Sequence, residues 1–109
     1  MKQELKTVDN NFITTLTRPL FKEDKEAYTI RIKAENSSER VHVTAFRADG
    51  VSVSGTGLSP DDTGYSEYTL SREMYSVTGK LVLRVAVISG GSMITVRQIE
   101  CKVMEDING

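Results

Sequence analysis

The sequence predicts a single all-β domain, a sandwich of about seven to eight short antiparallel strands. Three observations predict it. Apolar and polar side chains alternate with a period of two in several segments, so that one face of each strand is buried and the other meets water. Clusters of turn-forming residues separate these segments, and no segment keeps the 3.6-residue period of a helix. A chain of 109 residues has room for one core of this kind.

The first strands are predicted at 11–18, 27–34 and 40–47. The segment 11–18 is the weakest of the three, whereas the other two alternate regularly. In the third segment Val43 belongs to the apolar face and His42 to the outward face. Both regular segments therefore read as half-buried strands.

The pair Asp49-Gly50 comes directly after the third strand and suits a type I′ turn, beyond which the alternation restarts at Val51. This pattern predicts a hairpin. A weaker strand is predicted at 65–70. The segment 80–88 is apolar at nearly every position, which is typical of a central strand covered on both sides.

The last strand is predicted at 93–104, where the apolar set moves from one parity to the other. A change of parity requires a β-bulge, which we place near Arg97 and Gln98. Between the two preceding strands, Ser71 is positioned as the N-cap of a single helical turn at 71–75.

The predicted domain covers 11–105, with a flexible N-terminal arm at 1–10 and a tail, or a joint to a following segment, at 106–109. The arm lacks the apolar core of a secretory signal, and no stretch is long enough to span a bilayer. We expect a protein made in the cytoplasm of the producing cell, without a signal peptide and without a membrane partner.

The charge pattern argues against nucleic acid as a partner. Fourteen basic and fifteen acidic residues give a net charge of -1, and the two signs are interspersed along the chain. A nucleic-acid-binding surface would require a basic stripe with interleaved aromatic residues. The sequence has no such stripe and no Trp.

The sequence offers few groups for catalysis. His42 and Cys101 are the only residues of their kinds, and they fall on opposite faces of the predicted strands, with Cys101 as a small buried hydrophobe. Asp61 and Asp62 lie in a turn-forming loop without the spacing of a calcium loop, so an Asx-type turn is favoured over a calcium ion. We therefore expect no enzyme activity, catalytic residue, metal or cofactor.

Binding surfaces are the remaining candidates. Phe46 shares the outward face of its strand with His42, and an exposed aromatic patch is typical of an interface, although burial inside the sandwich is favoured. Three tyrosines could form a carbohydrate platform, although packing at the core or rim is favoured for Tyr65, Tyr68 and Tyr75. The candidate interface residues are His42, Phe46, Tyr65 and Tyr75.

Three motifs carry a resemblance to a known family. Residues 68–70 read Tyr-Thr-Leu, and residues 75–79 form a Tyr-x-Val-x-Gly corner before a long apolar strand. Residues 48–50 read Ala-Asp-Gly in a hairpin. Together these motifs resemble the N-terminal domain of phage baseplate upper proteins, and the likeness runs from about Phe12 to Met104, nearly the whole chain.

The resemblance implies an immunoglobulin-like β-sandwich in a tailed-phage virion, where it would attach a host-recognition fibre to the particle. It implies virion proteins as partners, with a homo-oligomer in the full-length assembly, and it transfers no receptor-binding residue. Three other functions stay open: a capsid or tail decoration domain, a carbohydrate-binding module, and a bacterial surface adhesion domain.

Overall fold

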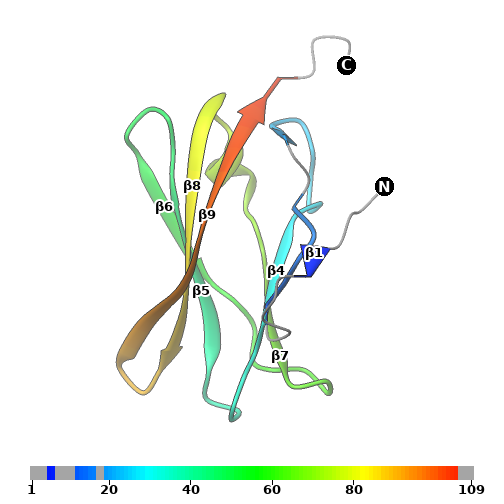
Figure 1. Cartoon of the computed structure of the whole chain (residues 1–109), viewed down its shortest axis with the longest axis vertical. Coiled ribbons are helices and arrows are strands. Elements are labelled where there is room, and N and C mark those ends of the chain that lie inside the picture. The colour runs from blue at the N-terminus through cyan, green and yellow to red at the C-terminus, as the bar shows by residue number, and fades with distance from the viewer. Residues whose placement is uncertain (1–4, 7–11, 17–18, 106–109) are drawn as a thin grey trace.

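The computed structural model describes residues 5–6, 12–16 and 19–105, which form two facing β-sheets (Figure 1). The strand orders are β1-β2-β4-β7 and β3-β9-β8-β5-β6, and among the described strands only β3 and β9 pair in parallel. The all-β prediction is confirmed. The elements are β1 (Leu5–Lys6), β2 (Phe12–Thr14), β3 (Leu20–Phe21), β4 (Thr29–Lys33), β5 (Arg40–Phe46), β6 (Ser52–Thr56), β7 (Tyr65–Thr69), the 3₁₀ helix η1 (Arg72–Tyr75), β8 (Gly79–Ser89) and β9 (Ser92–Met104).

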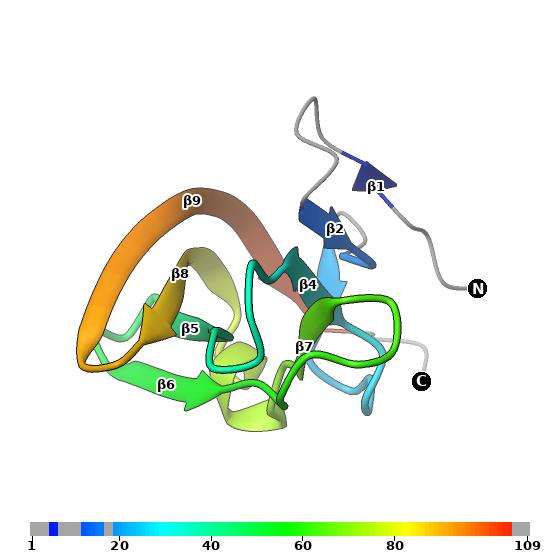
Figure 2. The ribbon, with the colours of Figure 1, turned by 90° about the horizontal axis from the view of Figure 1, so that it is seen from below.

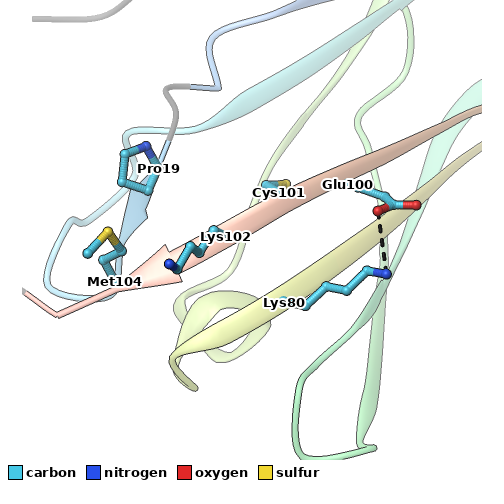
Figure 3. A pocket seen from close by; sticks show the side chains of 6 residues that line it. All are labelled: Pro19, Lys80, Glu100, Cys101, Lys102 and Met104. Atoms are coloured by element: carbon cyan, nitrogen blue, oxygen red, sulfur yellow. Dashed lines mark ion pairs between the residues drawn. The ribbon is translucent and has the colours of Figure 1, made fainter.

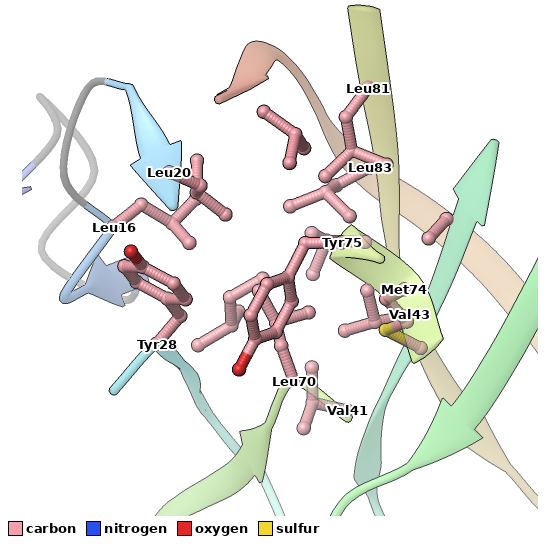
Figure 4. Close-up of a cluster of buried hydrophobic side chains, with 14 of the residues drawn as sticks. Leu16, Leu20, Tyr28, Val41, Val43, Leu70, Met74, Tyr75, Leu81 and Leu83 are labelled. Carbon is pink, nitrogen blue, oxygen red and sulfur yellow. The ribbon is translucent and has the colours of Figure 1, made fainter. Parts of the chain in front are cut away.

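The core lies between the sheets (Figure 4). Tyr28 and Tyr75 meet edge to face there, with ring centroids 5.2 Å apart. The Tyr28 hydroxyl donates to the carboxylate of Asp24 at 2.6 Å, and the Tyr75 hydroxyl donates to the Asp24 carbonyl at 2.8 Å. Each buried aliphatic side chain around them contributes about 1.5–3 kcal/mol to folding. The other large side chains that are fully buried among the described residues are Leu20, Ile30, Val41, Val43, Leu70, Met74, Leu81, Leu83, Val85 and Val103.

Strand β5 has the alternation that its sequence predicts. Val41, Val43 and Ala45 are buried against the core, whereas His42 and Thr44 are half-buried on the outer face. The strand lies between β8 and β6 in the five-stranded sheet. Its inward residues therefore anchor the sheet, and its outward residues are available to solvent.

The β5–β6 hairpin exists, but its turn is not the predicted type. A type I′ turn needs positive φ at both central residues. Only Gly50 has one here, at 85°, and the Gly50 amide donates to the Arg47 carbonyl at 3.1 Å. The loop between the paired residues Arg47 and Val51 has three residues, 48–50, one more than a type I′ hairpin has. In this longer loop only Gly50 adopts the left-handed conformation. Asp49 stays at negative φ and pairs with the Arg47 guanidinium at 2.6 Å.

Strand β8 is central, between β9 and β5, as predicted. The predicted parity change in β9 also exists. Val85 pairs with Arg97 and Ala86 pairs with Thr95, so that Val96 is the extra residue of the bulge. The bulge therefore lies one residue before the predicted position. Seen end-on, β9 curves across one open side of the sandwich towards the four-stranded sheet (Figure 2).

The sequence does not predict the two shortest strands. β3 adds two residues in parallel beside Val103 and Met104, and β1 pairs with β2 inside the segment expected to be a flexible arm. Two-residue strands show no alternation, so they leave no sequence signal. The rest of 1–10, and the predicted tail at 106–109, lie outside the described residues.

The predicted helical turn at 71–75 is a 3₁₀ helix, η1. Ser71 is its N-cap, as predicted, but its side chain makes no capping hydrogen bond. The turn is instead closed by the Met74 amide, which donates to the Ser71 carbonyl at 3.0 Å. Burial of Met74 and Tyr75 between the sheets holds the turn in place.

Candidate interaction surfaces

The four candidate interface residues fall in three different places. His42 and Phe46 lie on the outer face of the five-stranded sheet, and Tyr65 lies on the outer face of the four-stranded sheet. Tyr75 does not lie at a surface, because its side chain is 0% exposed in this chain, which agrees with the core packing favoured for it. Helix η1 turns it between the sheets, where burial raises the pKa of its hydroxyl and Tyr28 adds to that rise.

The outer face around Phe46 combines an aromatic ring with a cation. Phe46 is 37% exposed, and the Arg84 guanidinium carbon lies 5.1 Å from its ring centroid. His42, on the same face, places Nδ1 3.0 Å from Thr56 Oγ1. An exposed cation–π pair of this kind is worth about 0.5–1 kcal/mol. An exposed aromatic ring beside a cation suits side-chain contacts with a protein partner.

Tyr65 is engaged by neighbours of its own chain. The Arg31 guanidinium carbon lies 4.8 Å from its ring centroid, and the Lys33 ammonium lies 5.2 Å from it. Arg31 also forms ion pairs with Asp61 at 3.1 Å and Glu67 at 3.4 Å. The ring is thus the centre of a local charged cluster.

Asp61 organises the loop before β7 as the predicted Asx-type turn. One of its carboxylate oxygens accepts hydrogen bonds from the Thr63 hydroxyl, the Thr63 amide and the Tyr65 amide. The Thr63 hydroxyl, with these amides and the Arg31 charge, lowers the pKa of Asp61 to about 2. Across the described part of the chain, no three His, Cys, Asp or Glu side chains are grouped to hold a metal ion.

The three tyrosines weighed as a carbohydrate platform do not share a surface. Tyr65 faces outward, Tyr75 is in the core, and Tyr68 points inward beside Met74, with its hydroxyl 3.8 Å from Sδ. A Cβ at Gly55 would lie 2.2 Å from the Tyr68 hydroxyl oxygen, so β6 carries a glycine there to admit the ring. Tyr68 therefore packs in the sandwich.

His42 and Cys101 are not brought together. In the register of β8, His42 lies opposite Ala86 on the outer face, whereas Cys101 lies opposite Leu81 and packs partly against the core. Opposite faces of the sheet and several residues of β8 separate the two side chains. The arrangement gives the thiol no histidine base.

A shallow groove of about 730 Å³ runs over the C-terminal end of β9, beside β3 (Figure 3). Lys80 and Glu100 cross its rim, with Lys80 Nζ 3.4 Å from Glu100 Oε1. Both groups are largely exposed, so the ion pair adds little to stability. The groove is lined by Pro19, Lys80, Glu100, Cys101, Lys102 and Met104.

The sequence reasoning missed an apolar surface at the far end of the β8–β9 hairpin. Met93 is 62%, Ile94 66% and Val96 48% exposed, and we call these three residues the hairpin patch. The sequence predicts a strand at 93–104 whose apolar side chains are buried, so it does not predict that these three are exposed. The parity change gave no signal of this exposure, because the bulge at Val96 keeps Ile94, opposite Val87, on the same face as Ile99, opposite Leu83.

Part of the hairpin patch borders a groove between β9 and the four-stranded sheet. Ile94 and Val96 line this groove, of about 310 Å³, together with Phe12, Ile32 and Val87. Charged side chains from both sheets surround it. An apolar floor inside a charged rim is the usual anatomy of a protein-binding surface.

Neither a protein-family model nor a curated protein matches the chain. Within the described residues, no helix has the length and apolar character needed to cross a bilayer.

Proposed function

We propose that this chain is an immunoglobulin-like structural module of a tailed-phage virion that binds other virion proteins, as a baseplate or fibre-anchoring domain. The family resemblance supports the virion context. Its best motif, the Tyr-x-Val-x-Gly corner at 75–79, contains η1's buried Tyr75 and ends at Gly79, where φ is 121°. The fold thus explains two residues of the motif, because Tyr75 fills the core and Gly79 adopts a positive φ. The motif therefore supports a shared fold more than a shared binding site.

The hairpin patch is the observation that carries the binding role. Three large apolar side chains are exposed at one end of a small domain whose core is otherwise well covered. Exposed apolar surface is unfavourable in water unless a partner covers it, and Ile94 and Val96 lie together in the lining of the bordering groove. We assign the hairpin patch and its bordering groove as the contact with another virion protein.

Particle incorporation tests this proposal. Antibody against the purified chain is used to probe density-banded particles, cytosol and cell envelope from the producing culture. We expect the chain to band with the particles at a structural ratio to the other virion proteins. Recovery in the cell envelope or the cytosol alone would contradict the virion role.

Surface variants test the binding site within that role. Ile94→Asp should abolish incorporation while the variant stays folded, because the charge would be buried in the contact. Met104→Asp is the matched control, since Met104 is 38% exposed and lies at the opposite end of β9 from Ile94. Equal incorporation of both variants would show that binding uses another surface.

A further inference from the structure

Strand β6 forms an open edge without charge. It is the last strand of the five-stranded sheet, and the run from Gly50 to Pro60 contains no Asp, Glu, Lys or Arg. Its side chains are small, and Val51 beside it is 44% exposed. Natural sheet edges are usually protected by charge, proline or a bulge. Between Ser52 and Thr56, β6 has none of these.

The backbone hydrogen bonds at the two ends of β6 show which groups face the open side. The carbonyl of Val51 and the amide of Gly57 bond back toward β5, at 3.0 and 2.7 Å. In an antiparallel pair the backbone groups of successive residues point to alternate sides. The amides and carbonyls of Ser52, Ser54 and Thr56 therefore face away from β5, where no described strand pairs with them.

We propose that β6 pairs antiparallel with β6 of a second copy of this chain, about a two-fold axis at Ser54. This register places Ser54 opposite Ser54 of the second copy, and Ser52 opposite Thr56 of the second copy. The three residue pairs formed in this way exchange six backbone hydrogen bonds, all of them made by the groups that face the open side. The result is one continuous sheet that crosses the dimer. This inference is independent of the virion role.

Side-chain sizes match in the same register. It sets Val53 opposite Gly55 of the second copy and Val51 opposite Gly57 of the second copy, so each valine meets a glycine. Neither pair brings two bulky residues together. The strand is therefore complementary to itself in size as well as in hydrogen bonding.

Charge explains why a second copy fits. A two-fold axis brings each charge near its own copy, and like charges directly opposite destabilise a sheet. The uncharged run of β6 avoids this repulsion. The neighbouring turn carries one Arg and one Asp, which already neutralise each other through the Arg47–Asp49 pair.

Sedimentation velocity tests the pairing. The edge is short, so we expect a weak dimer with a Kd on the order of 10 µM, detected across about 1–500 µM of the whole chain. Ser54→Lys puts two lysines face to face and should raise the Kd about tenfold or more. Thr95→Lys, an equivalent change of an exposed hydroxyl residue on β9, should leave the Kd unchanged. A wild-type monomer throughout, or a dimer insensitive to Ser54→Lys, overturns the proposal.

Disulfide trapping tests the register in a Cys101→Ser background. Opposed residues in a hydrogen-bonded pair have Cα atoms about 5.5 Å apart, within the range of a disulfide. Ser54→Cys should therefore give a covalent dimer on mild oxidation. Ser52→Cys should not, because the two copies of residue 52 would lie about 14 Å apart along the strands. Equal cross-linking of both variants overturns the two-fold at Ser54.

Discussion

The two edges of the five-stranded sheet differ in how they are protected. Strand β9 curves, contains the bulge at Val96, carries Arg97, Glu100 and Lys102, and is closed at its end by β3. Strand β6 has no bulge in its pairing with β5 and no charge. Charge and bulges prevent strand addition. We therefore expect β9 to contact a partner through its side chains, and β6 to contact one through its outward-facing backbone amides and carbonyls.

The core supports both edges, so removing part of it should destabilise the whole domain. Tyr75→Ala deletes a fully buried ring and leaves a cavity beside Tyr28. We expect a loss of about 3–5 kcal/mol in the free energy of unfolding. Urea unfolding followed by circular dichroism measures it. Tyr65→Ala is the control, and an equal loss there would contradict the placement of Tyr75 in the core.

A substitution on the inner face of β6 tests which side of this strand packs against the core. A Cβ at Gly55 would lie 2.2 Å from the Tyr68 hydroxyl oxygen, so Gly55→Ala must displace that ring. We expect the free energy of unfolding to fall by about 1–3 kcal/mol. Ser54→Ala, on the outward face of the same strand, should leave the monomer's stability unchanged in the same denaturant titration. A stability loss confined to Ser54→Ala would reverse the assigned faces.

A substitution in the hairpin patch tests whether the exposed side chains of β9 serve binding or stability. Ile94 is 66% exposed, so Ile94→Asp should alter the free energy of unfolding by no more than about 0.5 kcal/mol. The same substitution should abolish partner binding, which separates binding from stability. Thermal melting beside the incorporation assay checks both expectations. A marked drop in melting temperature would mean that Ile94 supports the fold.

The smallest expected effect lies away from both edges, in the loop before β7. The pKa of Asp61 is lowered to about 2, below the value of about 3.9 for an unfolded aspartate. The stability it contributes is therefore complete above about pH 4 and is lost as the pH falls through about 2. Asp61→Asn should flatten the acid limb of stability against pH, measured by urea unfolding at several pH values. Parallel acid limbs would contradict the assignment.

The sequence predicts the parts of the fold that depend on local alternation. β4, β5, β8 and β9 lie within about two residues of their predicted limits, because a strand with one buried face needs apolar residues at every second position. The β5–β6 turn was placed correctly but given the wrong type. Asp49-Gly50 suits both a two-residue type I′ loop and a three-residue loop that ends in a left-handed glycine. Which of the two forms depends on the pairing of the flanking strands, here Arg47 with Val51.

The candidate surfaces were less predictable. The register confirms that Phe46 and His42 share one outward face. Tyr75 packs in the core, as favoured, but its direction had no periodic signal because it lies in a single 3₁₀ turn. The hairpin patch depends on where β9 leaves the sandwich. That is a property of the assembled sheets, and no local pattern reveals it.

Amide hydrogen exchange by NMR tests the difference between the two edges most directly. Spectra of the wild-type chain are compared at low and high protein concentration. We predict that the amides of Ser52, Ser54 and Thr56 become protected as the concentration rises, while those of β9 between Met93 and Lys102 exchange at the same rate. Protection that rises along β9, or no change along β6, would contradict the account.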